Sequence, residues 1–431
     1  MLKISKINNV IPVIKNHTGN KAEGSLMTKI NTLPADLAKP STNNLQAYIP
    51  SFSAKSNGTS SDRIPSRNVQ MRTVKSSLDN KTRAVLTELD KQGILDDTNS
   101  NDGSSVLENL YKIATEPRIQ GLSNTQIMKD VVTALSNPYS ITQKFGDIPD
   151  EALNEVEQQT GEKVPDEARN VISSSCVVAS MEFNLASRKP AEFARFAEGL
   201  SSKNYSVDKK IKMSDIANGT VSAIWTLREF NTDNIIDKNW EDVTINIKPD
   251  RNAIVRARVQ NSYRDNNERS CVDVLIQSAL LNLGSQHTYD ALTDVRTGKF
   301  NPDKNGLTDF EKNFVEEVVF ETPKISVVYQ SLDENGYLTG YNCEREETKQ
   351  HILKSLAAGQ NVIIGYTHLD DNNKVDGGHE ITIIGYKQDE NGNNWFICND
   401  TDDEKDEPVM INEEKLLPLI HHAGITQEAL G

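Results

Sequence analysis

The spacing of hydrophobic residues changes along the chain. Between about residues 78 and 284 they recur every three or four positions, which is typical of helices with one buried face. Residues 272–284 show this best, because their aliphatic side chains fall on a single stripe. With Ser104 or Ser105 and Ser123 as caps and Pro190 in a first helical turn, the pattern predicts helices over 82–95, 104–115, 123–137, 176–189, 190–200, 214–230 and 272–284.

Beyond about residue 320 the hydrophobic residues alternate or run continuously over strand lengths. Asn-Gly and Asp-Asn turn signals separate these segments. The pattern predicts strands over 324–332, 361–369, 379–387 and 394–399. Because the helices come first and the strands follow, we expect an α+β fold with an antiparallel sheet.

Composition divides the chain into three parts. Residues 1–75 are rich in Ser, Asn, Thr and Lys and lack sustained periodicity, so we interpret them as a disordered leader. Residues 76–148 carry the first three predicted helices and form a small helical subdomain in this interpretation. Residues 149–431 are then the main domain. The residues leave open whether the helical subdomain inhibits or docks.

Charge is distributed unevenly along the chain. Residues 1–80 contain 11 Lys and Arg against 4 Asp and Glu, a net charge of +7. Because the net charge of the whole chain is −15, residues 81–431 carry a net charge of −22. A body this acidic offers no clustered basic surface, which argues against nucleic acid as a partner. The sequence has neither a signal-type apolar segment nor a run of about 18 apolar residues. We therefore expect no membrane insertion, and either a cytoplasmic location or export by a non-classical route through the leader.

The four cysteines are far apart, and no CxxC motif or Cys/His cluster occurs. This spacing argues against a disulfide framework and a structural zinc site. A calcium-like segment at 301–312 ends in Lys312, where a calcium loop needs a bidentate Glu. We expect no metal and no cofactor. The four residues are Cys176, Cys271, Cys343 and Cys398.

Three positions carry the residue types of thiol catalysis. Cys176 follows three serines at a predicted helix start, where the helix dipole favours a thiolate. Asn170, six residues earlier, could join the Cys176 backbone N–H in an oxyanion hole. His379 follows two glycines and begins a predicted strand, in a position to act as base.

The strand after His379 ends in two candidate orienting residues, Asn399 and Asp400. Because side chains alternate along a strand, only one of the two can face His379. A two-residue turn at Asn391 and Gly392 would place Asn399 opposite Ile384, five residues from His379. The sequence therefore predicts an irregular hairpin if either side chain is to reach the ring.

These residues resemble the papain-like cysteine peptidases, cathepsins included. The similarity lies in Gly378-His379, Gly385-Tyr386, Trp395 and Asn399, in that order, downstream of a cysteine that opens a helix. It implies a helical lobe with a central Cys helix, followed by an antiparallel sheet lobe. It also implies a peptidase with a peptide or protein substrate, in which Cys176 is the nucleophile, His379 the base, Asn399 the orienting residue and Asn170 an oxyanion donor.

The chain also departs from that family. Asn170 stands where the family has Gln, Val177 replaces an aromatic residue, and the shielding tryptophan after the orienting residue is replaced by an acidic run. Bacteriocin-processing relatives have Asp as the orienting residue, so Asp400 is an alternative to Asn399. Cys271, which opens another predicted helix, is an alternative nucleophile.

Other activities fit the same residues. An acyltransferase or transglutaminase-like enzyme would use the same triad, and a catalytically inactive binding protein could keep the fold. The oligomeric state is not indicated by the sequence.

Overall fold

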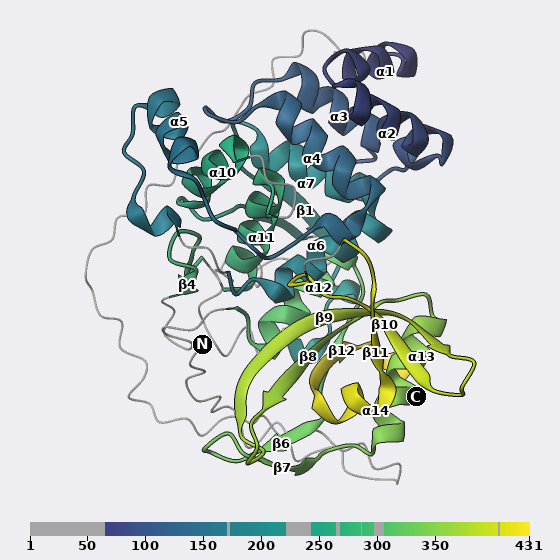
Figure 1. Ribbon diagram of the computed structural model, residues 1–431. Coiled ribbons are helices and arrows are strands. Elements are labelled where there is room, and N and C mark those ends of the chain that lie inside the picture. Colours follow the sequence, from purple (N-terminus) through teal and green to yellow (C-terminus); the bar gives the residue numbers. More distant parts are fainter. Residues whose placement is uncertain are drawn as a thin grey trace. The chain divides into compact units, whose positions relative to one another are not determined.

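Most helices precede the main sheet in a computed structural model, which describes residues 65–169, 173–220, 243–263, 268–285, 287–296, 306–403 and 406–431. A six-stranded sheet follows them (Figure 1), with a helix at Arg345–Ala357 inserted among its strands. This arrangement confirms the expected α+β class. None of the described helices is long and apolar enough to cross a membrane.

The helices follow the predicted spacing closely. Ser105 and Ser123 are N-caps, each accepting a hydrogen bond from a backbone N–H in the first turn, as predicted. The described helices are α1 (Arg67–Ser76), α2 (Asn80–Lys91), α3 (Val106–Thr115), α4 (Asn124–Ser136), α5 (Asp150–Thr160), α6 (Cys176–Arg188), α7 (Pro190–Ser201), α10 (Ala253–Ser262), α11 (Cys271–Gly284), α12 (Asp309–Phe320), α13 (Arg345–Ala357), α14 (Glu413–Leu416) and α15 (Gln427–Leu430).

The main sheet is antiparallel, with strand order β11-β10-β9-β8-β12-β5. Strand β9 is the longest and lies next to β8 and β10. The strands of this sheet are β5 (Ile325–Val328), β8 (Val362–Leu369), β9 (Val375–Gln388), β10 (Asn394–Asn399), β11 (Val409–Asn412) and β12 (Ile420–Ile425). Three two-stranded sheets pair β1 (Val207–Ile211) with β2 (Val243–Ile247), β3 (Tyr289–Asp290) with β4 (Val295–Arg296), and β6 (Gln330–Leu332) with β7 (Leu338–Tyr341).

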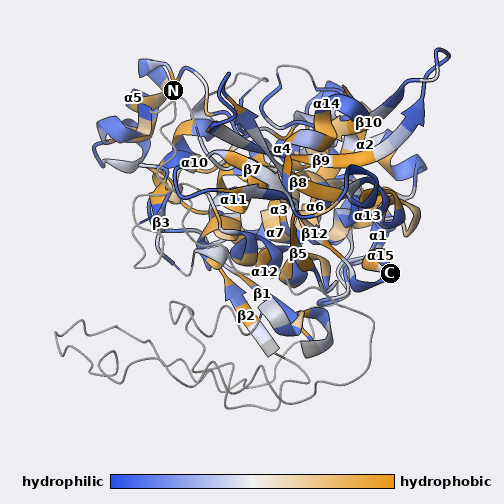
Figure 2. Cartoon of the chain, turned by 90° about the horizontal axis from the view of Figure 1, so that it is seen from below, coloured by the Kyte–Doolittle hydropathy of each residue, from blue (hydrophilic) through white to orange (hydrophobic). Residues whose placement is uncertain are grey.

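Two hydrophobic cores lie on opposite faces of this sheet. Ile363 of β8 joins the core of the helical part, whereas its neighbours Val362 and Ile364 join a second core with α13. This division follows from the period of two along a strand. Helix α6 lies between the helical part and β9 (Figure 1), and most of its residues are buried. In Figure 2 the strands β8 and β9 are largely orange, the colour of hydrophobic residues.

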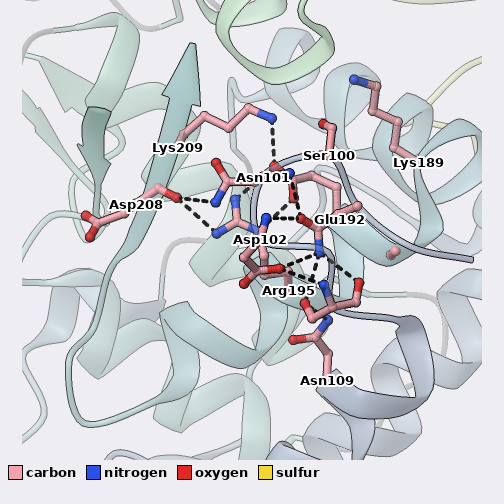
Figure 3. Close-up of polar contacts among 12 residues, drawn as sticks. Ser100, Asn101, Asp102, Asn109, Lys189, Glu192, Arg195, Asp208 and Lys209 are labelled. Atoms are coloured by element: carbon pink, nitrogen blue, oxygen red, sulfur yellow. Dashed lines mark hydrogen bonds and ion pairs between the residues drawn. The ribbon is translucent and has the colours of Figure 1, made fainter. Parts of the chain in front are cut away.

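A buried ionic network joins the first helices to those after α6 (Figure 3). Glu192 of α7 is 2% exposed and accepts hydrogen bonds from Arg195 at 2.7 and 2.9 Å and from Lys209 of β1 at 2.9 Å. Asn101, in the loop before α3, accepts from the backbone N–H of Lys210 at 2.6 Å. Residues 76–148 therefore share polar contacts, and the helical core, with residues after 149.

Some elements differ from the sequence expectations. Helix α1 lies mostly within the segment that we interpreted as a disordered leader, so ordered structure begins before residue 75. Helices α5 and α13 were not predicted, because their hydrophobic residues are few and α13 interrupts a strand-rich region. Most of the predicted helix at 214–230 lies outside the described residues.

Candidate active site

Cys176 is the accessible N-terminal residue of a helix whose middle is buried. It is the first residue of α6 and is partly exposed, whereas the ten residues that follow it are all buried. In the described structure the side chain of Ser175, the N-cap residue, makes no capping hydrogen bond to the helix. The first N–H groups of α6 are therefore not occupied by their own cap, and the positive end of the helix dipole faces the thiol.

His379 and Asp400 form a close pair on two neighbouring strands. His379 is the fifth residue of β9 and does not begin the strand as predicted, and Asp400 directly follows β10. The Nε2 atom of His379 lies 2.7 Å from Oδ1 of Asp400, and the two side chains are 11% and 22% exposed. Asp400 also accepts a hydrogen bond from the backbone N–H of Asp402 at 2.9 Å. The carboxylate thus holds the imidazole from one side and is itself held by the following turn.

An irregular β9–β10 hairpin brings this pair together. Beyond the loop, Trp395 pairs with Lys387, and the register shifts by one residue between Ile397 and Cys398. Asn399 then lies opposite Thr382 rather than Ile384. The two-residue turn would have left it two positions farther along β9, so the expected irregularity is present.

The same register decides which side chain meets the ring. Asn399 shares the sheet face of its partner Thr382, and His379, three residues before Thr382, lies on the opposite face. Asp400 follows Asn399 and therefore lies on the face of His379. Asn399 is 2% exposed, and its Nδ2 atom has no hydrogen-bond partner among the described residues.

The residue after Asp400 is anchored from the helical part of the chain. The carbonyl of Thr401 accepts hydrogen bonds from the hydroxyl of Thr142 at 2.9 Å and from the N–H of Gln143 at 3.1 Å. The Thr401 hydroxyl lies 3.2 Å from Oε1 of Gln143. These contacts tie the end of β10 to the segment after α4, which limits the movement of Asp400.

The charge of the imidazole is set by its two neighbours. Burial lowers the pKa of His379, but the Asp400 carboxylate and the Cys176 sulfur outweigh burial and raise this pKa well above its usual value. Burial raises the pKa of Asp400, but the hydrogen bond to His379, the charge of His379 and the N–H of Asp402 together outweigh burial and lower this pKa below its ordinary value. Because Nε2 faces Asp400, Nδ1 is the nitrogen left for the thiol proton.

Tyr366 is a site residue that the sequence reasoning missed. It lies directly opposite His379 on β8, and the two rings meet edge to face with centroids 5.8 Å apart. Tyr366 covers part of the imidazole. The family that the sequence resembles has a tryptophan in this shielding role, and this chain has an acidic run in its place. The only sequence signal for Tyr366 was its position in the strand beside His379, and using it required the β8–β9 register.

The structure places the remaining candidates as follows. Cys271 opens α11 but is 1% exposed, and its thiol lies 3.2 Å from Oδ2 of Asp130. Its helix is closed by Ser270 in a capping box, so Cys271 lacks both access and an open helix end. Asn170 lies outside the described residues. Among the described residues no group of His, Cys, Asp or Glu side chains is arranged to hold a metal ion.

Comparisons with protein-family models, with curated proteins and with solved structures find no match to this chain.

Proposed function

We propose that this protein is a papain-like cysteine hydrolase that cleaves peptide or isopeptide bonds. The observation that supports the proposal is the meeting of three groups: the Cys176 thiol at an open helix end, the His379 ring to which it hydrogen-bonds, and a carboxylate 2.7 Å from that ring. Cys176, His379 and Asp400 stem from distant parts of the sequence and fill the three roles that thiol catalysis needs.

The proposed reaction has two steps, formation of a thioester on Cys176 and hydrolysis of that thioester. The Cys176 thiolate attacks the carbonyl carbon of the substrate, and the resulting oxyanion accepts a hydrogen bond from the Cys176 N–H. The His379 imidazolium donates its proton to the leaving amine as the C–N bond breaks, which leaves a thioester on Cys176. His379 then takes a proton from water as the water attacks the thioester. The carboxylic acid and the Cys176 thiolate are released, which restores the starting thiolate and imidazolium.

Asp400 gives the proposed site a charged orienting group in place of an amide. A carboxylate both fixes the imidazole tautomer and favours the imidazolium form, consistent with the raised pKa of His379. In this proposal the orienting role belongs to Asp400, because Asn399 is directed toward Thr382. Asn170 remains the predicted second oxyanion donor.

Site-resolved alkylation tests the proposal without a known substrate. The protein is treated with iodoacetamide at pH 6.5, and the modification of each cysteine is followed by peptide mass spectrometry. Cys176 should react at least tenfold faster than Cys343, which is also partly exposed but whose pKa is raised to about 11 by burial and by Glu347. His379→Ala should remove this advantage.

Equal rates for Cys176 and Cys343, or an unchanged Cys176 rate in His379→Ala, would contradict the proposal. Incubation with unfolded casein, with and without an added primary amine, then separates hydrolysis from acyl transfer. New amino termini that disappear in Cys176→Ala indicate a peptidase, and amine incorporation indicates a transferase.

A further inference from the structure

The three residues before Cys176 are held by buried polar side chains from a distant part of the chain. Ser173 and Ser175 are 3% and 0% exposed, so their hydroxyl groups need partners inside the protein. Those partners come from α11, from the residue two before it, and from the loop between β3 and β4.

Asp294, in the loop between β3 and β4, makes most of these contacts. Its Oδ2 atom accepts hydrogen bonds from the backbone N–H of Ser174 at 2.6 Å and from the Ser174 hydroxyl at 2.7 Å. Its Oδ1 atom lies 3.1 Å from the hydroxyl of Ser173 and 2.7 Å from that of Tyr289. One buried carboxylate therefore fixes both the backbone and the side chains of the segment that leads into α6.

The backbone of Asp294 adopts a conformation that is costly for a residue with a side chain. Its φ angle is +55°, in the left-handed region, and the residue is 5% exposed. Such conformations cost free energy and persist where the surroundings require them, often at functional sites. Here the strained backbone directs the carboxylate toward Ser174.

The hydroxyl of Ser175 bonds to side chains outside α6, which leaves the N-terminus of this helix without a side-chain cap among the described residues. This hydroxyl donates to Oε1 of Gln277 at 2.8 Å and accepts a hydrogen bond from the guanidinium of Arg269. Turned toward these side chains, the hydroxyl does not cap α6. In α11 the corresponding Ser270 accepts from the N–H of Asp273 at 3.1 Å and closes the helix end. The difference between the two cysteine helices therefore lies in where the preceding serine points.

We propose that Asp294 is a positioning residue, which holds Ser173 and Ser174 so that the open end of α6 presents the Cys176 N–H to the oxyanion of the substrate. This inference rests on the proposed function of Cys176. Asp294 acts through the backbone of the segment before the nucleophile and does not touch the reacting atoms.

Two reagents separate this role from simple stabilisation. p-Nitrophenyl acetate transfers its acetyl group to the Cys176 sulfur and releases p-nitrophenolate through a tetrahedral oxyanion. Iodoacetamide alkylates the same sulfur by displacing iodide, with no oxyanion. A loss of oxyanion positioning should slow acylation and leave alkylation nearly unchanged, whereas general damage to the site should slow both.

Asp294→Asn should slow Cys176 acylation by roughly 10- to 100-fold and change alkylation by less than about threefold. Asp294→Gly, which relieves the backbone strain but removes the side chain, should slow acylation further. Ser174→Ala removes one contact to Asp294 with little risk to folding and should show the same selective loss to a smaller extent. Asp290→Asn is the matched control, because in the described part of the chain its carboxylate accepts hydrogen bonds from Asn252 and from two N–H groups of its own loop and none from Ser173 or Ser174.

An unchanged ratio of acylation to alkylation in Asp294→Asn and Ser174→Ala would overturn the inference. So would an equal change of that ratio in Asp290→Asn. The proposed function fails separately, and earlier, if the wild-type protein shows no acylation of Cys176 that depends on His379.

Discussion

At the scale of single residues, the site depends on which of two neighbouring side chains meets the histidine. Asn399 and Asp400 are adjacent in the sequence, yet only Asp400 lies against His379, at 2.7 Å. A carboxylate stabilises an imidazolium much more strongly than an amide does. Asp400 therefore favours the protonated form of His379, and the protonation of this ring should depend on Asp400.

Replacing Asp400 tests this dependence. Asp400→Asn removes the charge that raises the pKa of His379, so the alkaline limb of the pH profile for iodoacetamide alkylation of Cys176 should move to lower pH. Asp400→Ala should also slow this alkylation, by roughly 100-fold. Asn399→Ala is the control and should leave the limb in place. A limb that moves in Asn399→Ala and not in Asp400→Asn would assign the orienting role to Asn399.

The pair of His379 and Asp400 also stabilises the folded protein, by an amount that depends on pH. Because the pKa of His379 is raised in the folded protein, this contribution is complete below the ordinary pKa of about 6.5 and is lost as pH rises through the folded-state value. The wild-type protein and Asp400→Asn should therefore differ more in urea midpoint near pH 6 than at alkaline pH.

At the scale of elements, two helices that begin with cysteine differ in how their N-termini are capped. Helix α11 is closed by Ser270 in a capping box with Asp273, and α6 is not capped by Ser175. A closed helix end satisfies its own N–H groups, and an open one can bind a developing negative charge. The local chemistry thus suits α11 to packing and α6 to the role proposed for Cys176.

Ser270→Ala should therefore act on stability alone. Loss of the cap should lower the free energy of unfolding by about 1 kcal/mol, as measured by urea denaturation. Ser136→Ala, which removes only an exposed hydroxyl bonded to the Thr133 carbonyl, should have a smaller effect. Faster alkylation of Cys271 than of Cys176 in the Ser270 variant would contradict the assignment of α11 to packing.

At the scale of the whole molecule, the helices before residue 148 are part of the core that supports α6. The network of Glu192, Arg195 and Lys209 continues to Glu321, the residue after α12, which accepts a hydrogen bond from Lys209 at 2.6 Å. Glu321 also accepts a hydrogen bond at 2.7 Å from Ser100, in the loop before α3. Burial raises the pKa of Glu192, but its two cationic partners lower it below the usual range, so the carboxylate is charged in the folded protein. Removing that charge should weaken several elements at once.

Glu192→Gln should lower the free energy of unfolding by roughly 3–5 kcal/mol, because it leaves Lys209 and Arg195 buried with one charge fewer. Urea denaturation followed by circular dichroism measures the change. The matched substitution Glu88→Gln breaks an exposed pair with Lys91 and should cost no more than about 1 kcal/mol. Similar losses for the two variants would show that the buried network contributes little.

Much of the fold could be predicted because its cause is local. Hydrophobic spacing and serine caps are properties of short segments, so α2, α3, α4, α6, α7 and α11 and strands β8, β9 and β10 lie close to their predicted ranges. Helix α13 was missed because its buried face is mostly polar, so its hydrophobic period is weak, and because it lies in a strand-rich region. The buried residues are Thr348, His351, Ile352 and Ser355. Tyr366 and Asp294 were missed because their partners are more than ten residues away.

The sequence by itself determined the class of fold, the segments that became helices and strands, and the short list of residues able to support thiol chemistry. These follow from side-chain chemistry and from the periods of 3.6 and 2. Only the tertiary structure decided that Asp400 rather than Asn399 meets His379, that α6 is open while α11 is closed, and that Asp294 holds the residues before Cys176. Each of these depends on a register shift, a diverted hydroxyl group or a long-range hydrogen bond, which arise only when distant segments pack together.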